Sequence, residues 1–394
     1  MAASNAPNPF RIHGVVAEPF FTDRSAEVAR ILKTLREPAA KLIVYGPRRM
    51  GKTSAILRAI ARHEAKGGVA FLADMSTAST LTDVANRVLE TAGRALGRKW
   101  KDAVGDLIKR VGLTITLTPE PGTGVIVPSL DLKLRTAPLE EQRDSLAKTL
   151  DAVDALAKAR KTTIGIVLDE FQAIEHFGGE SAEWHLRGII QHHQHVSYVL
   201  AGSQAHIIAR MLDKGRAFYG LADQLLFGPI EPAHLAAWID DRMASSGVKA
   251  AGVGALIVDL AGPRTRDIVQ VARQCFDRCR AVGRAGADDV AQAFEDVVSE
   301  QESPMRQAWQ RLTAAQQNVL RAVATAVPGL TTADTMRRFG LGSSGGTTKV
   351  AQALIEQGHL VRTEGGSGYG FESPFMRRWV EREAMGDLGG GANR

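Results

Sequence analysis

Residues 46–53 read Gly-Pro-Arg-Arg-Met-Gly-Lys-Thr, directly after the apolar run Leu42–Tyr45 and directly before a helix-forming run, Ser54–His63. A buried strand, a glycine-rich turn and a helix in this order aim a row of backbone N–H groups at one point in space. Gly46 and Gly51 let the backbone bend there and approach a ligand closely. The stretch is a complete G-x-x-x-x-G-K-[ST] motif, and its setting predicts a loop that binds the triphosphate of a nucleotide.

The residues of this loop have separate expected roles. The Lys52 ammonium reaches the β- and γ-phosphates and assists catalysis, and the Thr53 hydroxyl coordinates Mg²⁺. Backbone N–H groups of the same loop surround the phosphates. The sequence therefore predicts nucleotide contacts from Gly46, Pro47, Arg48, Arg49, Met50, Gly51, Lys52, Thr53 and Ser54.

A second motif follows the apolar run Ile164–Leu168, which reads as a strand covered on both faces and ends in Asp169-Glu170. Asp169 is expected at the carboxyl edge of the sheet, beside the phosphate loop. There it would hold Mg²⁺ through water or Thr53, while Glu170 polarises the water that attacks the γ-phosphate. The acidic pair predicts hydrolysis of the nucleotide in addition to its binding.

A third apolar run, Val196–Ala201, ends in Gly202-Ser203-Gln204 at the same expected edge. Ser203 or Gln204 is a candidate to sense the γ-phosphate or to orient the water, and a turn-forming serine is the alternative. Farther along, Arg264 and Arg266 open an apolar-striped helix. They would contact the nucleotide from a small helical lid, or else face solvent at the helix start.

The composition sets wider limits. At 394 residues the chain is long enough for two or three domains, and its net charge of +6 is compatible with an acidic partner. Two cysteines, Cys275 and Cys279, exclude a disulfide framework. No run approaches the roughly 20 apolar residues of a membrane span, and the start lacks a signal pattern, so we expect a cytoplasmic protein without membrane contact.

The order of predicted strands and helices indicates an α/β fold of the P-loop NTPase type, in which helices cover a parallel sheet. Alternating leucines and threonines over 112–136, with Leu130, Leu132 and Leu134 on one face, predict an inserted β-hairpin, either a binding arm or an extra edge hairpin. The expected domains are a leader at 1–20, a P-loop core at 21–228, a helical lid at 229–302, a helical module at 303–383 and a tail at 384–394.

The module at 303–383 has the layout of a winged helix. A capping box, Thr313-x-x-Gln316, opens its first helix, and two further helices surround the turn at 340–346. Two short strands at 360–363 and 369–371 then flank a glycine-rich loop, which is the expected wing. In such modules the second helix of the turn lies in the major groove of DNA.

The same module is basic, with ten Lys/Arg and six Asp/Glu between residues 303 and 383. The expected DNA contacts are Arg337, Arg338, Thr348, Lys349 and Arg362. The expected recognition helix offers Thr347, Thr348, Lys349 and Gln352 but no arginine for a guanine edge. Docking of a protein is therefore the alternative role of this module.

Taken in order, these motifs resemble the archaeal-type ATPases of the STAND class of P-loop NTPases, and more distantly the origin-recognition initiator ATPases of the AAA+ group. The resemblance covers nearly the whole chain and implies ATP as the nucleotide and a switch whose ATP-bound state engages partners. It is carried by Phe21-Thr-Asp-Arg24, Tyr45–Ser54, Val167-Leu-Asp-Glu-Phe-Gln172, Leu200-Ala-Gly-Ser203 and Ser373-Pro-Phe-Met-Arg-Arg-Trp379.

One departure from that family concerns the arginine that a neighbouring subunit often supplies. Such proteins often have Tyr-Gly-Arg after the fourth strand, whereas this chain has Tyr219-Gly220-Leu221. Arg210 or Arg216 would substitute, a homo-oligomer or protein partner would supply an arginine, or hydrolysis is slow. The family's Asp before Pro-Phe is Ser373 here.

Three functions follow as hypotheses. The first is a Mg²⁺-dependent ATP-hydrolysing switch whose nucleotide state controls the winged helix, on DNA. The second is a signalling or defence scaffold that oligomerises through its ATPase domain and docks protein with the winged module. A metabolic phosphotransferase is the weakest of the three, because no second substrate pocket can be named.

Overall fold

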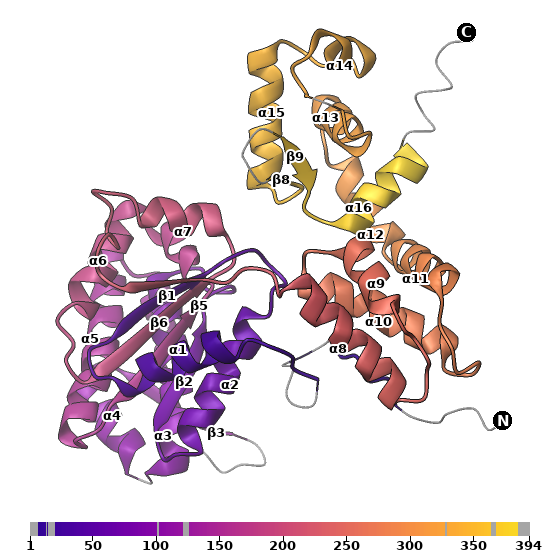
Figure 1. The fold of residues 1–394 in the computed structure, drawn as a ribbon. Coiled ribbons are helices and arrows are strands. Elements are labelled where there is room, and N and C mark those ends of the chain that lie inside the picture. The colour runs from indigo at the N-terminus through magenta and orange to yellow at the C-terminus, as the bar shows by residue number, and fades with distance from the viewer. Residues whose placement is uncertain are drawn as a thin grey trace. The chain divides into compact units, whose positions relative to one another are not determined.

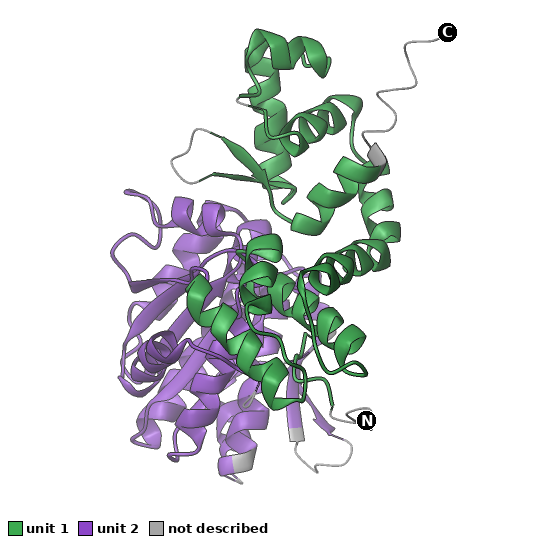
Figure 2. Ribbon diagram, turned by 45° about the vertical axis from the view of Figure 1, so that its right-hand side comes forward, with its two compact units in different colours: residues 1–12, 231–394 green, residues 13–230 purple. Residues whose placement is uncertain are grey.

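The computed structural model describes residues 7–12, 14, 20–100, 102–120, 126–327, 329–363 and 368–384. The chain divides into two compact units, one of residues 13–230 and the other of residues 1–12 together with 231–394 (Figure 2). Most of the leader expected at 1–20 and nearly all of the tail expected from 384 lie outside the described residues. No helix within the described ranges is long and apolar enough to cross a membrane.

Unit 2, residues 13–230, is built on a five-stranded sheet in the order β2-β5-β6-β1-β7, in which every neighbouring pair is parallel (Figure 1). β5 and β6 are buried along their whole length, as their largely apolar sequences predict. The predicted α/β fold is therefore confirmed. The strands are β1 Lys41–Tyr45, β2 Val69–Asp74, β5 Ile164–Asp169, β6 Val196–Gly202 and β7 Asp223–Leu226.

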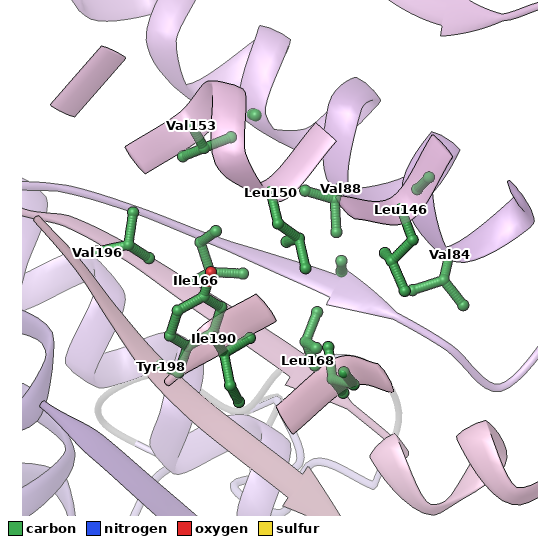
Figure 3. Close-up of a cluster of buried hydrophobic side chains, with 14 of the residues drawn as sticks. Val84, Val88, Leu146, Leu150, Val153, Ile166, Leu168, Ile190, Val196 and Tyr198 are labelled. Atoms are coloured by element: carbon green, nitrogen blue, oxygen red, sulfur yellow. The ribbon is translucent and has the colours of Figure 1, made fainter. Parts of the chain in front are cut away.

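Alternate residues of the strands face two different apolar layers. On one side, α1 (Ser25–Arg36) and α2 (Lys52–Glu64) pack on Val167, Val199 and their neighbours. On the other side, α3 (Leu81–Lys99) and α5 (Leu139–Ala159) cover the opposite residues. Figure 3 shows Leu146, Leu150 and Val153 of α5 and Val84 and Val88 of α3 directed toward Ile166, Leu168, Val196 and Tyr198. The unit also contains the helices α4 Ala103–Val111, α6 Glu180–Ile190 and α7 Ala205–Met211 and the 3₁₀ helix η2 Phe171–Phe177.

A two-stranded antiparallel hairpin, β3 (Ile115–Pro119) with β4 (Ile126–Leu130), lies in the region where alternation predicted one. The alternation expected to continue through Leu132 and Leu134 is wrong in detail, because Leu132–Arg135 forms a 3₁₀ helix. The Asp131 side chain accepts a hydrogen bond of 2.9 Å from the N–H of Lys133 and so turns the chain out of the strand. Residues 121–125 lie outside the described part of the hairpin.

Unit 1 begins, in chain order after the leader, with four helices: α8 Pro232–Ser245, α9 Val253–Ala261, α10 Thr265–Cys279 and α11 Ala287–Glu300. Phe10 belongs to this unit although it lies more than two hundred residues earlier in the chain. Its ring is fully buried and makes edge contacts with Trp238 and Phe276 at centroid distances of 5.6 and 6.4 Å.

The C-terminal part of unit 1 consists of helices and one small antiparallel hairpin. The capping box is present, because Thr313 and Gln316 each accept a hydrogen bond from the other's backbone N–H. The Phe294–Phe375 and Trp309–Trp379 pairs join α16 to α11 and α12. The elements are α12 Glu302–Gln310, α13 Ala314–Ala324, α14 Ala333–Arg338, α15 Ser344–Glu356, β8 Leu360–Arg362, β9 Tyr369–Phe371, α16 Pro374–Trp379 and a π-helical turn at Val380–Ala384.

Candidate nucleotide-binding site

The loop between β1 and α2 has the backbone shape that its two glycines allow. Gly46 has φ 158°, and a Cβ placed on it would lie 2.3 Å from the carbonyl oxygen of Phe227, so this close approach to the end of β7 requires glycine. Gly51 has φ 91° and precedes the first residue of α2. The N-terminus of α2 thus faces the loop with its unpaired N–H groups and the positive end of its dipole.

Lys52 is the first residue of α2 and is 6% exposed. Its Nζ donates hydrogen bonds to the carbonyl oxygens of Gly46 at 2.8 Å and Pro47 at 2.6 Å, so the ammonium is folded back on its own loop. Burial lowers the pKa of Lys52 to about 8, although the carboxylates of Glu170 and Asp169 oppose this shift. A phosphate group would offer this ammonium a stronger, charged acceptor than the two carbonyls.

Thr53 and Asp169 are brought together as expected from the sheet. The Thr53 Oγ1 donates a hydrogen bond of 2.8 Å to Oδ2 of Asp169, which is 6% exposed. Burial raises the pKa of the Asp169 carboxyl against the opposing effect of this hydrogen bond, and Asp74, its register neighbour on β2, also raises it. A buried carboxylate beside a hydroxyl is a hard-oxygen pair that fits Mg²⁺, whose charge would relieve the buried negative charge.

Glu170 has a restrained side chain. Its backbone is left-handed, with φ 53° and ψ 39°, and its Oε2 accepts hydrogen bonds from Ser203 Oγ at 2.7 Å and from the Gln172 amide. Arg48 of the phosphate loop donates from Nε to the same Ser203 oxygen at 3.3 Å. The end of β5, the end of β6 and the phosphate loop therefore form one hydrogen-bonded network.

Of the two candidates after β6, Ser203 makes these contacts. Gln204 instead precedes α7, where its carbonyl oxygen accepts hydrogen bonds from the N–H groups of Ile207 and Ile208. Gln172 was missed as a site residue, although it stands in the Asp-Glu-Phe-Gln segment that carried the family resemblance. The signal for its role is its place two residues after Glu170, which the 3₁₀ helix η2 turns back toward the strand end.

A second missed residue is Arg24. It precedes α1 and is 4% exposed, and its Nη2 donates to the carbonyl oxygens of Met50 at 3.3 Å and Gly228 at 2.6 Å. Its place in the Phe-Thr-Asp-Arg segment was the only sequence signal.

The two arginines expected to contact the nucleotide from a lid differ in their surroundings. Arg264 is 5% exposed and its Nη2 lies 2.5 Å from Oε1 of Glu372, just after β9, with Asp267 at 3.8 Å from Nη1. Arg266, on the first turn of α10, is exposed. Both belong to unit 1, and their contact with nucleotide stays a prediction.

Arg210 and Arg216, the candidates to replace the family's arginine that is Leu221 here, differ in their ion pairs and exposure. Arg216 forms an ion pair of 2.5 Å with Glu183, whose side chain is completely buried, so it anchors the segment after α7 to α6. Arg210 pairs with Glu175 at 2.6 Å, and half of its side chain, 51%, is exposed. Arg210 is the more available of the two to a second molecule.

The residues expected to contact DNA are all at the surface. Arg337 and Arg338 end α14, Thr348 and Lys349 lie on α15, and Arg362 ends β8, and each is exposed. The Thr348 hydroxyl is used within its own helix, donating to the Ser344 carbonyl at 3.0 Å.

A strand–loop–helix phosphate site beside an Asp-Glu strand end, on a sheet of this order, defines a P-loop NTPase. The chain belongs to the family described as an ATPase domain predominantly from Archaea, whose model matches residues 21–228. It is therefore an ATP-binding and ATP-hydrolysing enzyme, as the resemblance implied.

Solved structures of similar fold match nearly the full length of the chain. The Walker-type ATPase of Pyrococcus abyssi is 16% identical with a TM-score of 0.63, over 95% of this chain and 99% of that chain. The ORC2 protein of Aeropyrum pernix, solved as ADPNP–ADP complexes, is 15% identical with a TM-score of 0.57, over 96% of each chain. The ORC1 protein of the same organism, solved with DNA, is 17% identical with a TM-score of 0.50, over 95% of this chain and 97% of that chain. No curated protein matches the sequence.

Proposed function

We propose that the protein is a Mg²⁺-ATP-dependent switch, in which residues 46–54 hold the phosphates and the nucleotide state controls a C-terminal winged-helix module that binds DNA. The main observation in support of this site is the hydrogen bond between Thr53 and Asp169, next to Glu170. The metal would neutralise phosphate charge and orient the γ-phosphate once held by Thr53 and Asp169.

The protein's own side chains have defined tasks in this proposal. Lys52 leaves the carbonyl oxygens of Gly46 and Pro47 and donates to phosphate oxygens instead. Glu170 accepts a proton from the attacking water, while Ser203 and Gln172 hold its Oε2 and so set the direction of the carboxylate. These two donors limit how Glu170 can turn toward the water, and slow hydrolysis is the property that suits a switch.

Two substitutions test the assignment by separating binding from hydrolysis. Lys52→Ala should weaken ATP binding by at least about 100-fold, because it removes a charge-assisted contact to the phosphates. Glu170→Gln should keep ATP affinity and lower kcat by about 10²–10⁴-fold, the range for loss of a general base. Equal ATP affinity in the wild type and Lys52→Ala, measured by calorimetry, would refute the site.

DNA binding is the finer part of the proposal and is supported by the helices α13, α14 and α15 followed by the β8–β9 hairpin, by the exposed cations on them, and by the likeness in fold to a DNA-bound ORC1 protein. We also propose a cytoplasmic location and a partner subunit that supplies an arginine.

One observation favours the second function, a signalling or defence scaffold that oligomerises and docks protein with this module. Thr347 is buried and the Thr348 hydroxyl is bonded within α15. Lys349 and Gln352 then remain for reading bases, and the Gln352 amide itself donates to Glu356. If the wild-type protein shows no salt-dependent binding to duplex DNA in a gel shift, the second function is the one supported.

A further inference from the structure

Arg24 is held in an unusual backbone geometry that aims its side chain inward. Asp23 and Arg24 have consecutive left-handed φ angles of 55° and 65°, a conformation that ordinary residues keep only where their surroundings require it. The guanidinium stacks on the ring of Phe227 at 4.3 Å from its centroid, and Nη1 donates to Glu27 at 2.8 Å. A buried cation with these partners is fixed in place.

One nitrogen of this side chain serves two segments. Nη2 donates both to the carbonyl oxygen of Met50, next to Gly51 in the phosphate loop, and to that of Gly228, just after β7. The same two segments also touch directly, because Gly46 lies against the Phe227 carbonyl and the Phe227 N–H donates to the Tyr45 carbonyl at 2.7 Å. The phosphate loop and the segment after β7, residues 227–228 (the strand exit), are thus joined at two places.

The strand exit is where the chain leaves unit 2. Gly228 lies three residues before residue 231, at which the chain enters unit 1. Met50 is 3% exposed and packs in the same apolar layer as Phe227 and Ala55 of α2. A change in the phosphate loop that moves the Met50 carbonyl therefore alters the geometry at the nitrogen that also holds Gly228.

We propose that Arg24 is a positioning residue that couples the phosphate loop to the chain exit at Gly228, so that nucleotide binding changes the order of residues 225–231. This inference rests on the proposed assignment of residues 46–54 to the nucleotide. The planar fork of arginine can stack on Phe227 while it bridges two carbonyls, whereas a lysine ammonium cannot do both.

Hydrogen exchange of the full-length protein, with and without a non-hydrolysable ATP analogue and Mg²⁺, tests the coupling. In the wild type the analogue should slow amide exchange in peptides covering 46–54 and also in those covering 225–231. In Arg24→Met the slowing at 46–54 should persist. The factor by which the analogue slows exchange at 225–231 should be about tenfold smaller than in the wild type, because one hydrogen bond to a charged group stabilises by about that factor.

Arg24→Lys keeps the positive charge and serves if Arg24→Met does not fold. The proposal expects the same loss of response at 225–231 in this variant, whereas a purely electrostatic role predicts the wild-type response. Arg30→Met is the matched control, because Arg30 lies on α1, the helix that Arg24 precedes, with 46% of its side chain exposed and a 3.9 Å contact with Asp223. It should leave both responses unchanged.

The outcomes separate the coupling from the site assignment. A wild-type response at 46–54 with none at 225–231, or an equal response at 225–231 in the wild type and both Arg24 variants, overturns the coupling alone. Absence of any nucleotide response at 46–54 in the wild type removes the site assignment and the coupling with it.

Discussion

Ser203 Oγ lies 2.7 Å from Oε2 of Glu170 and donates a hydrogen bond to it. The two residues directly follow neighbouring strands, β6 and β5, and the second donor to the same carboxylate oxygen is the Gln172 amide. The expected general base is thus engaged by protein donors instead of being directed only at solvent. This restraint makes the rate of hydrolysis sensitive to the residues around Glu170.

Replacement of Gln172 by methionine should raise the basal turnover of ATP severalfold. Methionine keeps the buried volume beside Gly202 but cannot donate to Glu170, so the carboxylate reaches water more readily. Steady-state kinetics with ATP measures the effect, and Ala173→Ser, next in the chain, is the control. A fall in kcat with unchanged thermal stability would show that Gln172 assists Glu170 and does not restrain it.

ATP affinity should decrease as the pH rises above about 8. Free Lys52 has its pKa lowered to about 8, and phosphate oxygens would raise that pKa again, so binding takes up a proton above this pH. Above pH 8 the Lys52 contribution should lower the logarithm of the association constant by up to about one per pH unit. Below pH 8 this contribution should not change with pH. Calorimetry at pH 7 to 9.5 checks this, and Lys52→Arg should abolish the dependence.

Asp169→Asn should remove the Mg²⁺ dependence of nucleotide binding. The amide has no charge to attract the cation, so we expect equal ATP affinity with Mg²⁺ and with a chelator, and a kcat at least about 100-fold lower. Asp74→Asn is the matched control, because Asp74 is the register neighbour of Asp169 but is exposed. A variant at Asp169 that still gains affinity from Mg²⁺ would place the metal on other residues.

Charge reversal of Arg337, Arg338 and Lys349 together should weaken binding to duplex DNA and flatten its salt dependence. Each phosphate contact contributes about −0.9 to the slope of log affinity against log salt, so loss of three should reduce the slope by about three. Gel shifts over a salt series measure it. Reversal of Lys109, Arg110 and Lys148 in the ATPase unit makes the same change in net charge and should leave the slope unchanged.

The core of the ATPase unit should tolerate no cavity at Leu150, which α5 directs onto the sheet (Figure 3). Leu150→Ala should lower the free energy of unfolding by about 2–5 kcal/mol, from lost burial and the cavity left behind. Leu139→Ala, at the 39% exposed first residue of the same helix, should cost less than about 1 kcal/mol. Chemical denaturation compares the two.

The sequence predicted the phosphate loop and the Thr53–Asp169 meeting because parallel strands bring their carboxyl ends to one edge. It did not predict which donor would reach Glu170. That depends on the left-handed backbone at Glu170 and on the 3₁₀ turn that follows, neither of which leaves a periodic pattern.

Other misses have similar causes. The alternating pattern predicted strand through Leu134, but Asp131 accepts hydrogen bonds from the N–H groups of Lys133 and Leu134, and these turn the chain into a 3₁₀ helix. Arg24 and Arg264 are buried by partners distant in sequence, Gly228 and Glu372, and no local rule relates such residues.

The burial of Phe10 against Trp238 of α8 and Phe276 of α10 means that the first described residues pack with helices that follow residue 231, with the ATPase sheet inserted between them in the sequence. Two peptide connections therefore join the units, at 12–13 and at 230–231. A protease cut at either one alone would leave the halves tethered by the other. Removal of the first twelve residues would instead take the Phe10 ring away from Trp238 and Phe276. An N-terminal truncation would therefore leave a cavity beside α8 and α10, more than two hundred residues away in the sequence.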